Sequence, residues 1–306
     1  MFDTKGRALI TQSRRVRVTR LWAGLATLAV ASATFAVAAP AASASGSNTL
    51  TIKAGEYVYQ LKGSLKSGWS QIDFQNAGVE NHMLAVVQLK KGVTVKQLKA
   101  AATSSDNNAF TAIAAPGANP NGVAGFPTVL GPGQKTSTMT QLKAGHYGIM
   151  CFIPAASDGK PHVAHGMLKV FDVSTAKSSL KPPTDGVADV TLSDTAITVP
   201  PGNPGRQLTA KITNAGSAGH TFDLVKISDG KTLDDVNAYF NAFFSGQKPA
   251  GDAPGTIVGG IGEIDAGTTA YLVQTLKPGH YGYASTDGTA PNDDYGKGMK
   301  GEFDVK

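Results

Sequence analysis

The one cysteine of this 306-residue chain stands among side chains that bind soft metal ions. Cys151 is followed by His162, His165 and Met167, all within 17 residues, and His82 lies upstream. A thiolate, imidazoles and a thioether are soft and borderline ligands, and together they suit copper. The surrounding residues are typical of β-strands and a connecting loop. The sequence therefore predicts a mononuclear copper site held at strand ends.

Residues 1–44 have the three-part plan of a secretory signal peptide. Six basic residues precede a charge-free apolar run from Leu21 to about Ala39, and the small residues Ala42-Ser43-Ala44 follow it. Ordinary secretion and a twin-arginine route, suggested by Ser13-Arg14-Arg15, both remain open. An uncleaved membrane anchor is the alternative, because the run is just long enough to span a bilayer. We expect a secreted or cell-envelope protein with no stable membrane span after signal removal.

The charge of the chain comes almost entirely from this leader. Of the formal net charge of +6, residues 1–44 carry +5, so the rest of the chain is close to neutral at about +1. No basic stripe with interleaved aromatic residues follows, which excludes nucleic acid as an expected partner. A lone cysteine makes no internal disulfide. In an oxidising compartment its thiol must be buried or bound to be safe.

Three sequence motifs occur twice, in the same order and at offsets of 138, 134 and 132 residues. The pairs are Asn76–His82 with Asn214–His220, Leu142–Gly148 with Leu276–Gly282, and His165–Val173 with Lys297–Val305. This period is too long for a solenoid unit, and it predicts two copies of one domain. We place the copies at 48–175 and 188–306, joined by a polar, proline-containing linker at 176–187.

Each copy has the pattern of an all-β domain with one helical insertion. Short apolar and β-branched runs alternate with Gly, Pro, Asn and Asp, as in a Greek-key sandwich of short strands. Two segments instead carry apolar residues at helix spacing, Thr94–Ala102 and Lys231–Phe244. The predicted fold is two tandem β-sandwich domains, each with a short helix.

The motifs around the candidate ligands resemble those of cupredoxins, the plastocyanin and azurin family of type 1 (blue) copper proteins. The resemblance covers residues 48–173 and rests on an Asn-Ala-Gly turn before His82, a Tyr-x-x-x-Cys strand end and a Gly-Met step. It implies a cupredoxin-like Greek-key fold with one copper ion. The implied ligands are His82, Cys151, His162 and Met167, with four residues between the last two as in plastocyanin-like sites.

One feature departs from that family. Ten residues separate Cys151 from His162, where small cupredoxins have only a few. His165 is therefore the alternative to His162. It lies two residues before Met167, and residues two apart on an extended strand share a face.

The second copy resembles the fold without the full ligand set. The sequence aligns Ser285 with Cys151, Asp294 with His162 and Lys297 with His165, while His220 and Met299 remain. We expect no metal in this copy and a structural, hydrogen-bonding role for His220. His146 and His280 occur at matching positions of both copies, so we expect them to be structural too.

These observations favour a non-enzymatic copper protein. Multicopper oxidases and two-domain nitrite reductases need histidines beside the cysteine, whereas Met150 and Phe152 flank Cys151. The expected function is electron transfer or copper handling with an unidentified redox or copper-donor protein as partner. The alternative is a metal-free tandem β-sandwich module for adhesion or protein binding, with a vestigial site.

Overall fold

The computed structural model describes residues 48–106, 108–119, 122–288 and 293–306. The predicted signal peptide lies outside these residues. The described residues belong to one compact unit by their internal contacts. Within the described ranges, no helix is long and apolar enough to cross a membrane.

The chain is mostly β, with elements in a similar order in its two halves. The elements of the first half are β1 (Thr49–Gly55), β2 (Val58–Gly63), β3 (Leu65–Asn76), β4 (Ala85–Leu89), α1 (Val95–Ala102), α2 (Ala109–Ile113), β5 (Lys135–Leu142), β6 (Gly145–Met150) and β7 (Leu168–Lys177). Those of the second half are β8 (Ala188–Ser193), β9 (Ala196–Thr198), β10 (Gln207–Asn214), β11 (His220–Ile227), α3 (Leu233–Phe244), β12 (Gly255–Ile264), β13 (Thr269–Thr275), β14 (Gly279–Ala284) and β15 (Lys300–Val305).

Two layers of strands enclose the core of the first half. One layer is β2-β1-β3-β5, and the other is β4-β6-β7. The start of β3, at Leu65–Ser67, pairs with β7, while the rest of β3 pairs with β5 and β1. Alternate residues of β1 and β3 are buried, as expected for strands with one face on a core. Ile72, Phe74, Tyr147 and Ile149 pack together with Cys151 between the layers.

The second half repeats this pairing pattern. Strands β9-β8-β10-β13 form one layer, and β12-β11-β14-β15 form the other. The parallel pair β8–β10 corresponds to β1–β3, and the antiparallel pairs β11–β14 and β14–β15 correspond to β4–β6 and β6–β7. A separate buried cluster fills the space between these layers, with Ile212, Leu224 and Leu272 at its centre.

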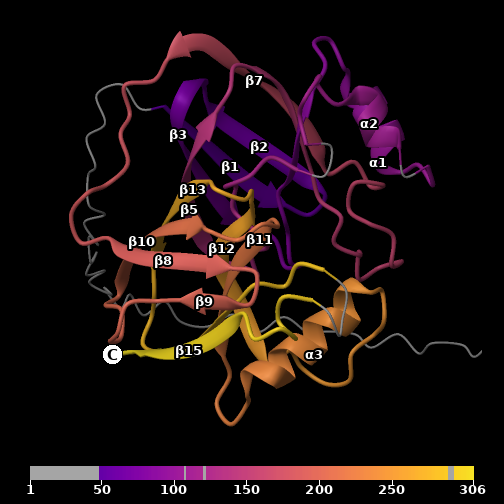
Figure 1. The fold of residues 1–306 in the computed structure, drawn as a ribbon. Helices are drawn as coiled ribbons and strands as arrows, with labels where there is room; N and C mark the ends of the chain where they lie inside the picture. Colours follow the sequence, from indigo (N-terminus) through magenta and orange to yellow (C-terminus); the bar gives the residue numbers. More distant parts are fainter. Residues whose placement is uncertain (1–47, 107, 120–121, 289–292) are drawn as a thin grey trace, which may run out of the picture. The chain divides into compact units, whose positions relative to one another are not determined.

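The two halves are joined by hydrogen-bonded strands, so two independent sandwich domains are not confirmed. β5 pairs antiparallel with β13, which makes one sheet of 11 strands (Figure 1). Residues 125–131 of the first half also bond β12, through Gly125 N to Glu263 O, Gly262 N to Phe126 O and Gly131 N to Ile257 O. An unpaired sheet edge exposes backbone donors and acceptors. Pairing β5 with β13 gives the backbone donors and acceptors at the edges of both strands hydrogen-bond partners. Because the two strands are far apart in the sequence, no local sequence pattern predicts this pairing.

The two predicted helices are present and begin where the sequence indicates. Thr94 caps α1 and Thr232 caps α3, each in a capping box with the residue three positions on, Gln97 or Asp235. The sequence did not predict α2, which has only five residues and no side-chain cap. Phe240 of α3 is buried, packing on β11 and β12 rather than between the two layers.

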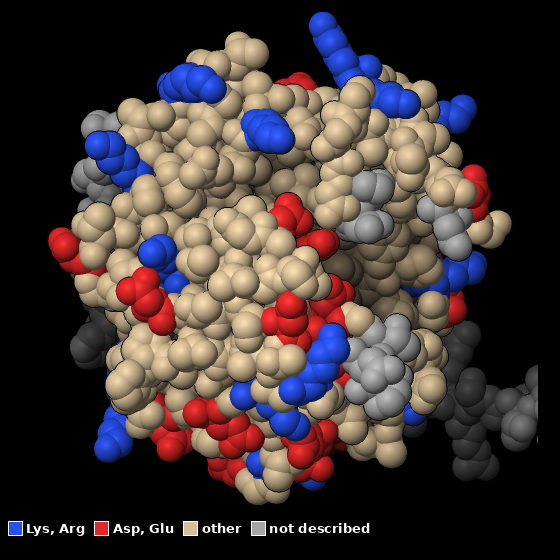
Figure 2. All heavy atoms as spheres, in the orientation of Figure 1, with Lys and Arg blue, Asp and Glu red and all other residues tan. Residues whose placement is uncertain are grey.

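Charged side chains of both signs are interspersed over the face shown in Figure 2. Acidic residues gather at the edge of a hollow on this face. A groove of about 540 Å³ runs between the halves, lined by Phe152 of the first half, Phe240 and Phe244 of α3, and the carboxylates of Glu263 and Asp287.

The junction of the halves gives a matched pair of glycine tests. Gly125 and Gly92 have nearly the same left-handed φ, +83° and +84°. A Cβ at Gly125 would lie 2.3 Å from Thr140 Oγ1, whereas at Gly92 nothing lies within 4 Å. We expect Gly92→Ala to cost about 1 kcal/mol of backbone strain. Gly125→Ala should cost about 2 kcal/mol more, from overpacking. Urea unfolding of both variants measures this difference, and equal losses would contradict the packing at the junction.

Candidate metal centre

The side chains of His82, Cys151 and His162 converge in the core of the first half. Their ligand atoms all lie within 4.8 Å of one another. His82 Nδ1 is 3.2 Å from His162 Nδ1, which is 3.4 Å from Cys151 Sγ. All three residues have no exposed surface. Among the described residues, this is the one group of three or more metal-ligating His, Cys, Asp or Glu side chains.

His82 is held by a turn after β3. The Asn76 side chain donates to Glu80 O (2.7 Å) and accepts from Gly78 N (2.9 Å), which closes that turn. The backbone of His82 then forms two hydrogen bonds with Leu130, 3.0 and 2.8 Å long. The Asn-Ala-Gly motif thus sets where His82 stands.

The long loop after Cys151 folds back on itself and returns His162 to the site. Cys151 directly follows β6. Ala155 N donates to Lys160 O, His162 N to Ile153 O and Val163 N to Cys151 O, each within 2.8–2.9 Å. Because the loop closes locally, its ten residues do not carry His162 out of reach.

Met167 is hydrogen-bonded through its backbone to Cys151 and His162, whereas the His165 side chain contacts Asp158 and Tyr57. Met167 is fully buried in the same cluster as Cys151. Its N donates to His162 O (3.0 Å) and its O accepts from Cys151 N (3.2 Å). His165 Nε2 instead bonds Asp158 Oδ1 at 3.1 Å, and its ring stacks on Tyr57 with centroids 4.7 Å apart.

Burial decides the protonation of these groups. It raises the pKa of the Cys151 thiol to about 11. It lowers the pKa of His82 to about 4, with help from nearby His162, and it also lowers the pKa of His162. Both imidazoles are therefore neutral at neutral pH and offer a lone pair, the form in which histidine binds metals.

Two glutamates that sequence reasoning missed stand behind the histidine rings. His162 Nε2 donates to Glu80 Oε2 at 2.9 Å. His82 Nε2 is buried without a hydrogen bond, and Glu56 Oε1 lies 4.0 Å from it. The internal repeat contained a signal for Glu80. Its counterpart in the second copy, which lacks the full ligand set, is Ala218.

The matching position in the second half holds a closed network of hydrogen bonds. His220 Nδ1 lies 2.6 Å from Asp294 Oδ2, and its Nε2 lies 3.1 Å from Asp194 Oδ1. Ser285 Oγ also donates to Asp294 Oδ2 (2.7 Å), and Lys297 Nζ lies 3.3 Å from Asp294 Oδ1. Both ring nitrogens of His220 thus have acidic partners.

The paired histidines His146 and His280 bond to neighbouring carboxylates away from the site. His146 Nδ1 donates to Asp172 Oδ1 (2.7 Å). His280 donates to Asp304 and Glu302, each at 2.9 Å. These contacts agree with structural roles.

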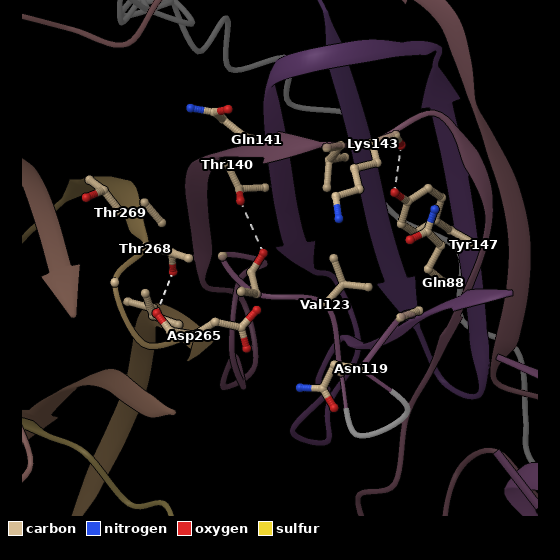
Figure 3. A pocket seen from close by; sticks show the side chains of 18 of the residues that line it. Gln88, Asn119, Val123, Thr140, Gln141, Lys143, Tyr147, Asp265, Thr268 and Thr269 are labelled. Atoms are coloured by element: carbon tan, nitrogen blue, oxygen red, sulfur yellow. Dashed lines mark hydrogen bonds between the residues drawn. The ribbon is translucent and has the colours of Figure 1, made fainter. Parts of the chain in front are cut away.

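A polar pocket of about 620 Å³ lies elsewhere, between β5 and the turn before β13 (Figure 3). Thr140 Oγ1 donates to Ala124 O there, and Tyr147 OH donates to Lys143 O. Those hydroxyls already have partners, and Cys151 does not line this pocket.

No protein-family model and no curated protein matches the chain. Auracyanin B is a similar solved structure, with 20% identity over 42% of this chain and 93% of that chain, and a TM-score of 0.29. A dithionite-reduced auracyanin of Roseiflexus castenholzii has 18% identity over 40% and 99%, with a TM-score of 0.29. A multicopper oxidase has 13% identity over 84% and 88%, with a TM-score of 0.24. TM-scores this low carry no argument, so the interpretation of the site depends on its own geometry.

The burial of Cys151 predicts an unreactive thiol in the folded, metal-free protein. A pKa of about 11 leaves roughly 100-fold less thiolate at pH 8 than an ordinary cysteine has. Ellman's reagent should therefore label the folded protein at least about 100-fold more slowly than the protein unfolded in urea. Similar labelling rates in the two states would contradict the buried position.

His280 should stabilise the fold only at low pH. Hydrogen bonds to Asp304 and Glu302 raise its pKa above the unfolded value of about 6.5. Its contribution is thus fully present below that value and is lost as pH rises through the folded pKa. Because His280 and its two acidic partners are largely exposed, their ion pairs contribute about 1 kcal/mol at most to the free energy of unfolding. In urea unfolding, His280→Gln should be less stable than wild type at pH 5.5 and equal to it at pH 8.5. A loss of the same size at both pH values would contradict this assignment.

Proposed function

We propose that the chain is an exported, cupredoxin-like protein that binds one type 1 copper ion in its first half, for electron transfer or copper handling. The proposed ligands are His82 Nδ1, His162 Nδ1 and Cys151 Sγ, and Met167 would be a weaker fourth ligand. The observation that carries the proposal is the convergence of the first three atoms within 4.8 Å of one another, in a buried site.

The separation of the two histidine nitrogens fits a single small ion. Two nitrogens bound at about 2.0–2.1 Å in a tetrahedral or trigonal site lie roughly 3.3–3.6 Å apart. The His82–His162 Nδ1 separation of 3.2 Å is close to this range. Two neutral imidazole nitrogens at that distance repel unless one carries a proton, so a cation between them would relieve the contact.

The donor set favours copper over other metals. Two histidines and a cysteine with a weak methionine form the ligand set of blue-copper electron-transfer sites. A bound copper ion would supply a one-electron couple. The chain's own residues exclude water, since the three ligand residues are fully buried, and the loop and sheet hydrogen bonds hold them in place.

The enclosed site supports a non-enzymatic role. A catalytic metal site keeps an open position for substrate, whereas these ligands lie under the protein surface. We propose that the second half is a related, metal-free β-sandwich, because Ser285 and Asp294 stand where Cys151 and His162 would be. The partner is a redox or copper-donor protein, met outside the cytoplasm after export by residues 1–44.

Copper titration of the purified metal-free protein tests the proposal. We expect one Cu(II) per chain and an intense visible band from the copper–thiolate bond. Cys151→Ser should abolish the band, and His82→Gln or His162→Gln should weaken binding at least about 10-fold, since each removes a ligand. His165→Gln is the matched control: it removes an imidazole from the same loop and should keep the band.

Two results would contradict this assignment in different ways. If the folded wild-type protein binds no copper, the metal-free binding module is the better interpretation. If His165→Gln loses the band and His162→Gln keeps it, the site exists but its second histidine is His165.

A further inference from the structure

The Glu80 carboxylate connects the segments that carry the ligands. Its Oε2 accepts from His162 Nε2 (2.9 Å) and from Ala156 N (3.2 Å), both in the loop after Cys151. Its Oε1 accepts from Tyr57 OH (3.2 Å), in the turn between β1 and β2. Glu80 itself stands two residues before His82. Its side chain is only 18% exposed, so the contacts to His162 and Tyr57 are partly shielded from water, while the contact to Ala156 lies at the surface.

This contact sets which nitrogen of His162 faces the ligands. A neutral imidazole has one N–H donor and one acceptor nitrogen. A carboxylate at Nε2 fixes the proton there, which leaves the Nδ1 lone pair toward Cys151 and His82. The Tyr57 ring also contacts the His162 ring edge-on, with centroids 4.8 Å apart. His162 is thus fixed in both tautomer and orientation.

The other histidine lacks an equivalent hydrogen bond. Glu56 Oε1 is 4.0 Å from His82 Nε2 and instead accepts from Val79 N. Glu56 is also more exposed than Glu80, with 41% of its side chain accessible. The two carboxylates therefore form a natural comparison, one bonded to a ligand ring and one only near it.

The internal repeat shows where such a carboxylate is needed. Ala218 stands at the position of Glu80 in the second half, and Thr195 at that of Tyr57. There, Asp294 replaces His162, so no second ring requires orientation. Glu80 and Tyr57 thus occur in the half that has the Cys and two His residues and are absent from the other.

We propose that Glu80 is a positioning residue of the metal centre, which holds His162 for ligation and places a negative charge beside the bound ion. This inference rests on the copper function proposed above. The charge stabilises Cu(II) relative to Cu(I) and so lowers the reduction potential. The hydrogen bonds to Ala156 and His162 also fasten the ten-residue loop.

Three variants separate these roles. Glu80→Ala removes both the hydrogen bonds and the charge, Glu80→Gln removes the charge but keeps an amide oxygen acceptor, and Glu56→Gln is the matched control. The measurements are the His162 ring tautomer in the metal-free protein by nitrogen-15 NMR, Cu(II) affinity by chelator competition, and the reduction potential.

We expect Glu80→Ala to lose the single Nε2–H tautomer of His162 and to bind Cu(II) about 10- to 100-fold more weakly. Glu80→Gln should keep the tautomer and the visible band while raising the reduction potential. Glu56→Gln should leave the His162 tautomer unchanged and should alter affinity and potential less than the Glu80 variants do.

The outcomes distinguish this inference from the function on which it rests. If wild type binds no copper, the proposed function fails, and the tautomer measurement still tests Glu80. If wild type binds copper and Glu80→Ala matches it in tautomer, affinity and potential, the role of Glu80 is overturned. Thermal unfolding of the metal-free variants checks the fold. If Glu80→Ala does not fold, an unchanged potential in Glu80→Gln overturns the inference.

Discussion

The burial of two imidazoles and a thiol at one point is the constraint on which the site depends. Polar atoms away from water need hydrogen-bond partners, or they weaken the fold. His162 meets this need on one side through Glu80, while His82 Nε2 has no hydrogen bond. On the other side, two Nδ1 atoms and a sulfur face one another. A bound cation would satisfy all three at once, and metal binding would in that way couple to the stability of the fold.

The second half meets the same constraint with internal charges. Around His220 the fold places Asp294, Asp194 and Ser285, and the contacts to its ring are 2.6 and 3.1 Å long. A buried charge is tolerated when it is paired and hydrogen-bonded. Met299 keeps the backbone bonds of Met167, since Ser285 N donates to Met299 O and Met299 N to Asp294 O. The same backbone hydrogen bonds thus support two different sites. In the first half, the Nδ1 atoms of His82 and His162 face Cys151 Sγ, and in the second half His220 is paired with Asp194 and Asp294.

The sequence predicted the parts of this structure that local chemistry determines. The two helical segments, the alternating strands and the candidate ligands follow from residue type and spacing over a few positions. The motifs around the candidate ligands also predicted that His82 and Cys151 would lie close together. The Asn-Ala-Gly turn and the Tyr-x-x-x-Cys strand end resemble the motifs that carry two of the copper ligands in cupredoxins. Sequence reasoning gave His162 as the ligand and kept His165 as an alternative, since the fold of a ten-residue loop depends on contacts such as Glu80 to Ala156. It also missed the pairing of β5 with β13, because edge strands carry no local mark of their distant partner.

A second contact between the halves, of residues 125–131 with β12, gives the second half a physical connection to the proposed metal centre. His82 is held by Leu130, and the next residue, Gly131, donates its N–H to Ile257 O of β12. A Cβ on Gly131 would lie 3.0 Å from Thr256 Cγ2 and 3.1 Å from Ile257 O, so the two backbones approach closely here. Residues 125–131 are therefore fixed on one side by β12 and on the other by the backbone of a proposed ligand. The second half can in this way support the proposed site without supplying a ligand, because it would limit how far His82 moves if a bound ion changed its charge.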